Sequence, residues 1–95
     1  MEQGVLVLHY YLFMFRSLTV AQRAARRLGP AGVRAAVIRA PYSLSADGCG
    51  YCIKISGVQS GHAFQVLEDT GLSPRKIFRA VGQDSYEEVV GFDLP

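Results

Sequence analysis

The chain has 95 residues and a mass of 10.4 kDa, so we expect residues 1–95 to form a single domain. A hydrophobic share of 49% allows a modest core, and a charged share of 19% argues against a disordered chain. The net charge of +2 is too small to indicate a nucleic-acid partner. Six of the ten basic residues precede position 41, together with only one acidic residue. We interpret this asymmetry as solvated helix faces rather than a basic patch.

An apolar run at residues 5–15, interrupted by His9, lies near the start of the chain. It is too short to span a bilayer, which takes about 20 residues, and it lacks the basic start and the cleavage site of a secretion signal. We therefore expect no membrane partner and predict a strand. Because both alternating sets of side chains are apolar, this strand should be covered on both faces, at least over residues 10–15.

Helical and extended patterns alternate after this strand. The spacing of apolar residues predicts a helix that begins at Leu18, with Ser17 as its N-cap, and that ends at Gly29 and Pro30. A second helix is predicted at residues 61–70, with Ser60 as its cap and Gly71 just beyond its end. Further strands are predicted at residues 33–39, 51–56 and 75–81, and an acidic but partly apolar tail covers residues 82–95.

This order of elements, β-α-β-β-α-β, is the split βαβ arrangement of ferredoxin-like domains. It predicts an α+β fold with a four-stranded antiparallel sheet, both helices on one face, and a core at about residues 10–81. Since the first strand is apolar on both sides, the face of the sheet without helices needs a cover. We expect this cover to be a second copy of the chain, giving a homodimer, or residues 86–94 of the tail.

Both cysteines lie in a Gly-rich segment between two predicted strands. Cys49 stands between Gly48 and Gly50, in a turn where a thiol is open to attack. Cys52 lies three residues further on, inside the predicted strand. We interpret Cys52 either as a small apolar core residue or as a second functional thiol.

The predicted topology places this loop at the end of the sheet where the first helix begins. Cys49 should therefore lie near Arg16, Ser17 and Arg39. Because a helix N-terminus and nearby arginines favour a thiolate over a thiol, we expect a lowered pKa for Cys49. We predict that Cys49 is more exposed and more reactive than Cys52.

The pair Cys49 and Cys52 has the spacing C-x-x-C. In an extended segment their Cα atoms would be roughly 10 Å apart, whereas a disulfide needs about 7 Å or less. A single C-x-x-C also supplies only two of the four ligands that zinc prefers. We therefore expect neither a disulfide nor a metal site.

Three segments carry a family resemblance that covers roughly residues 10–81. They are Phe-Arg-Ser at residues 15–17, residues 24–33 with Gly-Val at their end, and the Pro41, Ser45 and Cys49-Gly50 loop. With these features the chain resembles the selenium/sulfur carrier-like proteins. The resemblance implies that Cys49 holds sulfur or selenium as a persulfide or perselenide. The chain departs from that pattern in having Tyr42 in place of a basic residue, a loop one residue longer, and the additional Cys52.

We therefore expect a carrier of sulfur or selenium rather than a turnover enzyme, with no cofactor and with a sulfur- or selenium-donor enzyme as its partner. A cytoplasmic location is expected, because reduced thiols persist there. One alternative is a non-catalytic module for dimerisation or ligand sensing. The other alternative is a metal chaperone. It is weakened because the C-x-x-C motif of a chaperone would precede a helix, whereas the motif in this chain precedes a strand.

Overall fold

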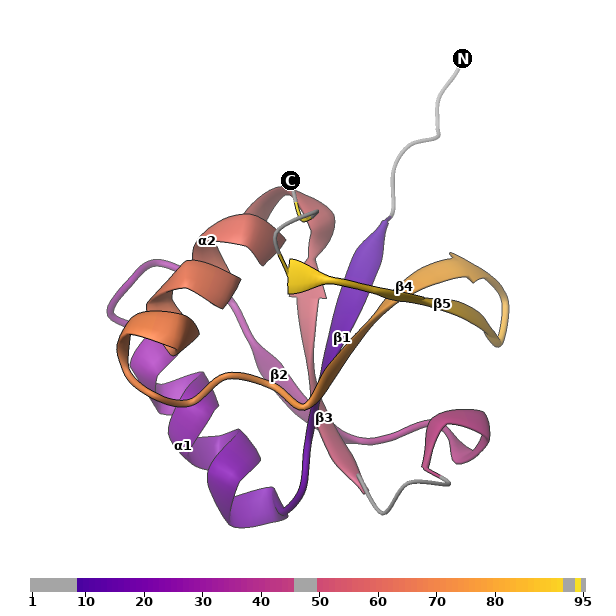
Figure 1. The fold of residues 1–95 in the computed structure, drawn as a ribbon, viewed down its shortest axis with the longest axis horizontal. Coiled ribbons are helices and arrows are strands. Elements are labelled where there is room, and N and C mark those ends of the chain that lie inside the picture. Colours follow the sequence, from indigo (N-terminus) through magenta and orange to yellow (C-terminus); the bar gives the residue numbers. More distant parts are fainter. Residues whose placement is uncertain (1–8, 46–49, 92–93, 95) are drawn as a thin grey trace.

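The computed structural model describes residues 9–45, 50–91 and 94. Its elements, in chain order, are β1 (Tyr10–Phe15), α1 (Leu18–Leu28), β2 (Ala36–Arg39), the 3-10 helix η2 (Tyr42–Leu44), β3 (Tyr51–Ser56), α2 (Gly57–Asp69), β4 (Lys76–Gly82) and β5 (Ser85–Val89). Two α-helices and an antiparallel sheet make an α+β fold, as the sequence predicts. Figure 1 shows α1 and α2 on one side of the sheet and η2 on the other. No helix in this part of the chain is long and apolar enough to cross a membrane.

The sheet has five strands in the order β2-β3-β1-β4-β5, and the expectation of four strands is therefore wrong. Each neighbouring pair is antiparallel, so β1 and β2, which both flank β3, run parallel to each other. The additional strand, β5, forms because the tail turns back at Asp84, whose φ is 58°. An edge strand is largely exposed on both faces. The sequence of β5, Ser-Tyr-Glu-Glu-Val, therefore lacks the alternation of apolar and polar residues that indicates a half-buried strand.

The tail is attached to the rest of the fold on both sides of the sheet. Arg79 and Glu87, which face each other across β4 and β5, form an ion pair. Gly91 lies against the ring of Phe64, where any larger side chain would collide with it. Leu94 packs against the core beneath the helices. The tail therefore extends the sheet at its edge, and its Tyr86 packs against the buried residues on the face without helices, which is part of the cover that one of our alternatives expected.

The start of α1 follows the sequence pattern, whereas the start of α2 does not. Ser17 is the N-cap of α1, and its Oγ accepts a hydrogen bond from the Val20 amide at 3.2 Å. By contrast, α2 begins at Gly57, so Ser60 lies within its first turn and donates to the Gly57 carbonyl at 2.8 Å. The cause is that β3 runs directly into α2 without a loop, and the Gly57 amide donates to the His9 carbonyl at 2.9 Å.

Two further boundaries refine the sequence prediction. Gly71 has a φ of +74° just after the end of α2, as expected for the residue that stops a helix. The strand predicted at residues 33–39 is shorter, because β2 begins only at Ala36. Before it, the Arg34 amide donates to the Gln59 side chain at 3.3 Å, so α2 rather than β3 holds this segment.

Both faces of β1 are buried, but by different neighbours. Tyr11, Phe13 and Phe15 point toward α1 and α2 and form the centre of the larger core. On the opposite face, Leu12 and Met14 are each 1% exposed. The smaller cluster there consists of Leu12, Met14, Ala40 and Cys52, flanked by Tyr10, Leu44, Phe78 and Tyr86. The expected cover of β1 is thus supplied within one chain.

Candidate functional site

Gly50, the residue after Cys49, lies directly before β3. Its carbonyl accepts a hydrogen bond from the Ala40 amide at 2.9 Å, which joins the end of β2 to the start of β3. In the sheet register, Tyr51 faces Phe15 on one side and Arg39 on the other. Gly50 therefore lies at the end of the sheet where β1 finishes and α1 begins.

Three arginines are attached to this same end of the sheet. Arg16 is exposed between β1 and α1. The guanidinium carbon of Arg39 lies 5.4 Å from the centre of the Tyr51 ring, a cation–π contact. Arg75, also exposed, donates its backbone amide to the Met14 carbonyl at 2.9 Å just before β4 begins. Among the described residues, three positively charged side chains therefore belong to this end of the sheet, while Ser17 is committed to capping α1.

Of the residues expected to form the site, Cys49 and Gly48 lie outside the described residues. In the structure Arg39 pairs with Tyr51 and Gly50 is hydrogen-bonded to Ala40, so these two site residues are neighbours across β2 and β3, and Arg16 and Ser17 lie at the same end of the sheet. The expected absence of a disulfide between Cys49 and Cys52 also involves Cys49, and so it concerns a residue outside the described ones.

Cys52 can be assessed directly. It is fully buried in β3, on the face away from the helices, opposite Met14 and Ile38 in the neighbouring strands. Desolvation by burial raises the pKa of its thiol to about 11. The thiol is therefore neutral near pH 7 and is shielded from any partner, which favours the interpretation of Cys52 as an apolar core residue.

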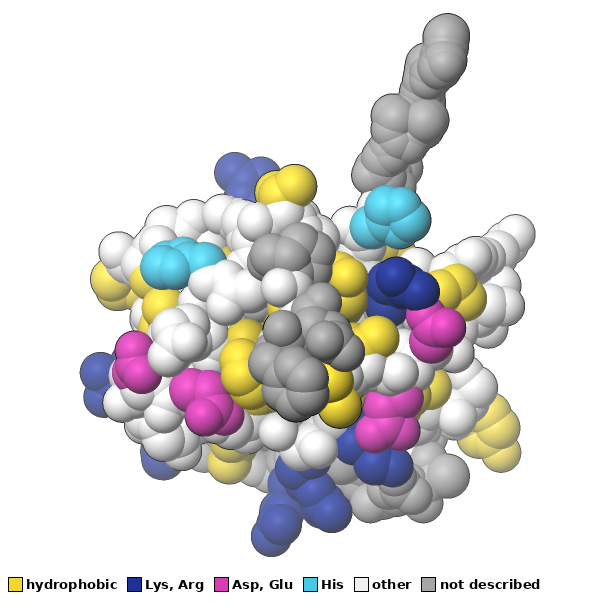
Figure 2. Space-filling model, turned by 45° about the horizontal axis from the view of Figure 1, so that its top comes forward, with side chains coloured by type: hydrophobic (Ala, Val, Ile, Leu, Met, Phe, Trp, Pro, Cys, Tyr) yellow, Lys and Arg dark blue, Asp and Glu magenta, His cyan; other side chains and the backbone are white. Residues whose placement is uncertain are grey.

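Among the described residues, no group of three or more His, Cys, Asp or Glu side chains could hold a metal ion. His62 instead makes a ring-nitrogen contact of 3.2 Å with the Ala31 carbonyl. Figure 2 shows acidic and basic side chains interspersed over the face in view. The uneven charge along the sequence does not produce a single-sign surface on that face.

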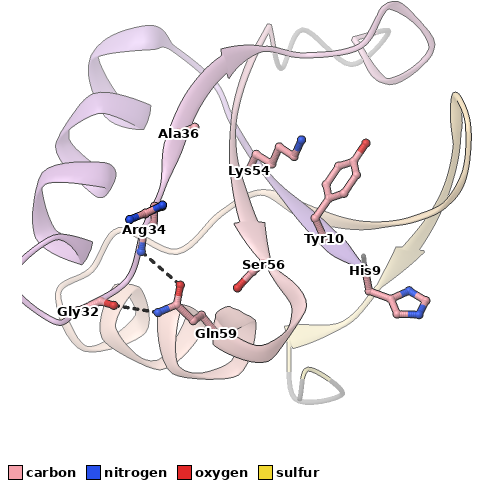
Figure 3. Close-up of a pocket in the computed structure, with 8 residues that line it drawn as sticks. All are labelled: His9, Tyr10, Gly32, Arg34, Ala36, Lys54, Ser56 and Gln59. Atoms are coloured by element: carbon pink, nitrogen blue, oxygen red, sulfur yellow. Dashed lines mark hydrogen bonds between the residues drawn. The ribbon is translucent and has the colours of Figure 1, made fainter. Parts of the chain in front are cut away.

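Sequence reasoning missed an open pocket of about 780 Å³ at the other end of the sheet (Figure 3). The pocket is lined by His9, Tyr10, Gly32, Arg34, Ala36, Lys54, Ser56 and Gln59. The signal in the sequence was Lys54, the single charged residue in the otherwise apolar segment Tyr-Cys-Ile-Lys-Ile.

One family model matches this chain. It describes the family as "Putative Se/S carrier protein-like" and covers residues 10–79. No curated protein and no solved structure matches the chain significantly.

Proposed function

Because the chain belongs to this Se/S carrier-like family, we propose that it carries a sulfur or selenium atom on Cys49. The observation that carries the proposal is the family match over residues 10–79, which ends well beyond the cysteine loop. The chain has two cysteines, and the neutral, buried Cys52 is unsuited to exchange with a partner. Cys49 is therefore the thiol to which the carrier role is assigned.

The surroundings of Gly50 support this assignment. Cys49 is bonded to Gly50, whose carbonyl is hydrogen-bonded to Ala40 at the end of the sheet that carries Arg16 and Arg39. Positive charge stabilises a thiolate relative to a thiol, and the thiolate is the nucleophile in sulfur exchange. The glycines on either side of Cys49 would leave room for the active site of a donor enzyme.

The transfer is an exchange in which no electron donor is needed. The Cys49 thiolate attacks the terminal sulfur of a persulfide on the donor enzyme. The bond between the two donor sulfurs breaks, the donor leaves as a thiolate, and Cys49 becomes a persulfide that keeps the proton of the terminal sulfur. An acceptor thiolate then takes the terminal sulfur by the same step, which regenerates Cys49. A perselenide would move in the same way, and the protein acts as a carrier rather than as a turnover enzyme.

We further propose that the protein is located in the cytoplasm, where reducing conditions keep the Cys49 thiol free.

The first four strands have the spatial order β2-β3-β1-β4, and we interpret them with both helices as a ferredoxin-like unit extended by β5. For the homodimer we propose pairing through β2, which is an edge of the sheet with Ala36 and Ile38 exposed. Size-exclusion chromatography with light scattering tests this, and a monomer at high concentration would contradict it.

Intact-mass measurement tests the carrier function. The protein is incubated with a cysteine desulfurase and cysteine, without reductant, and is compared with Cys49→Ser and Cys52→Ala. We expect the mass of one additional sulfur atom on the native protein and on Cys52→Ala, and its loss in Cys49→Ser. An adduct that persists in Cys49→Ser, or one that disappears in Cys52→Ala, would overturn the assignment.

A further inference from the structure

The pocket at the end of the sheet opposite Gly50 is built by the register of three strands. Tyr10 of β1 faces Ser56 of β3, and Ala36 of β2 faces Lys54 of β3. These four residues share the face without helices, because side chains alternate along each strand. Ala36 and Ser56 have small side chains, whereas those of Tyr10 and Lys54 are long. The surface is therefore hollow above the small residues and is bounded by the long ones (Figure 3).

One rim of the pocket is held in place by Gln59 of α2. Its Nε2 donates to the Gly32 carbonyl at 2.8 Å, and its Oε1 accepts from the Arg34 amide at 3.3 Å. Both hydrogen bonds are drawn in Figure 3. The backbone from which the Arg34 side chain extends is thus fixed relative to α2 and β3.

The lining is cationic. The Lys54 ammonium lies 4.3 Å from the centre of the Tyr10 ring, and Figure 3 shows its side chain extending toward that ring. Arg34 is exposed at the rim. No carboxylate lines the pocket, and within residues 9–45, 50–91 and 94 neither Lys54 nor Arg34 forms an ion pair. Two positive charges therefore face the hollow without a compensating negative charge from this part of the chain.

From this arrangement we propose that the pocket binds a small organic anion. Its carboxylate or phosphate group pairs with Arg34 and Lys54, the Ser56 hydroxyl adds a hydrogen bond, and a flat apolar part packs against Tyr10 and Ala36. Arg34 and Lys54 are suited to this role because oxyanions accept charge-assisted hydrogen bonds from both side chains. The proposal goes beyond the carrier function and does not depend on it, since the pocket contains no cysteine.

An apolar protein surface is a poorer occupant of the same pocket. It would remove the Lys54 and Arg34 charges from water without pairing them, which is costly. The volume of about 780 Å³ also lies within the range of roughly 300–1,000 Å³ that is usual for small-molecule sites. Charge and size thus select a small anion.

The experiment is a titration of the full ¹⁵N-labelled chain, followed by amide chemical shifts. The probes are phenyl phosphate and benzoate, with benzylamine as a cation of the same shape. We expect each anion to shift the amides of Tyr10, Arg34, Ala36 and Ser56, and for a given anion these four amides should report the same dissociation constant. The tighter of the two anions identifies the phosphate or the carboxylate as the preferred group.

Two variants and one matched control give the residue-level test. Arg34→Gln and Lys54→Gln should each weaken binding about tenfold, the effect of losing one charge-assisted hydrogen bond. Arg23→Gln removes the same charge from an exposed position on α1 and should leave the affinity unchanged within about twofold. The dispersion of the amide spectrum shows whether each variant is folded.

Four outcomes would overturn the proposal. They are equal shifts with benzylamine, shifts spread over α1 as much as over the pocket, no shift with either anion, and unchanged affinity in folded Arg34→Gln and Lys54→Gln. Shifts of the Tyr10 and Ser56 amides, which lie away from the β2 edge, that depend on protein concentration without any probe would instead place the pocket in an interface between copies and would equally overturn the proposal.

Discussion

The two faces of the sheet are covered in different ways, although the same strands supply both. On one face α1 and α2 bury the larger core around Phe13, Ile53 and Ile55. The other face has a smaller cluster around Leu12, Met14 and Cys52, and the remaining hollow carries Lys54 and Ser56. The comparison indicates that the helix face contributes most of the stability, whereas the open face has room for binding.

Truncating neighbouring residues of β1 gives the largest test of this difference. Phe13 and Met14 are both buried, but they point to opposite faces. We expect Phe13→Ala to lower the free energy of unfolding by about 4 kcal/mol and Met14→Ala by about 2 kcal/mol, because the smaller cluster can relax around the lost side chain. Urea denaturation followed by circular dichroism measures both values. An equal loss in the two variants would mean that the faces are equivalent in stability.

The burial of Cys52 predicts slow alkylation of the folded protein. Since its pKa is about 11 rather than the ordinary 9.0, the thiolate fraction near pH 7 is lower by about a hundredfold. Iodoacetamide labelling with peptide mapping should show at least this difference between the native and the urea-unfolded chain, with Cys49 labelled first in the native protein. Rapid labelling of native Cys52 would show that the open face admits solvent.

The same pKa has a consequence for stability at high pH. Because folding raises the pKa, the contribution of the neutral Cys52 thiol is complete below pH 9 and is lost as the pH rises toward about 11. Cys52→Ala should lack this part of the alkaline loss, as measured by urea midpoints at successive pH values. If the urea midpoints of the native protein and of Cys52→Ala fell in parallel as the pH rises, this would contradict the raised pKa of Cys52.

The smallest expected effect concerns Tyr86, which connects β5 to the open face. A hydrogen bond with Tyr10 is the main cause that raises the pKa of Tyr86 to about 12, and desolvation adds to it. Because the Tyr86 hydroxyl is largely solvated and can bond to water instead, we expect Tyr86→Phe to lower the free energy of unfolding by less than about 1 kcal/mol. Ultraviolet titration should also lose the tyrosine that ionises last. A variant that retains this late transition would place the high pKa on another residue.

Much of the fold was accessible from the sequence because its signals were local. Ser17 and Gly71 mark their helix ends by capping and by left-handed backbone, and residues 51–56 are a strand with the predicted bounds. The start of α2 was missed because Ser60 has the chemistry of a cap, although the hydrogen bond from Gly57 to His9 determines where the helix begins. β5 was missed because its pairing with β4 depends on contacts distant in sequence.

The candidate site was predictable only in part. The cysteine loop was visible as a motif, and the register explains why Arg39 lies beside Tyr51, next to Gly50. The pocket was not, because it depends on Arg34, Lys54 and Tyr10 meeting across three segments. Lys54 is marked in the sequence as an isolated charge, but only the strand register shows which side chains surround it.

The direct passage from β3 into α2 has a consequence for how the chain tolerates insertions and deletions. A Cβ at Gly57 would lie 3.1 Å from the His9 carbonyl oxygen, and no loop separates the strand from the helix. One residue added here would rotate α2 by about 100°, which would turn Ala63 and Leu67 away from the core. At the turn between β4 and β5, where Gln83 and Asp84 are exposed, an added residue has only the edge strand to displace. Length changes should therefore be tolerated at that turn, while the junction at Gly57 keeps a fixed length.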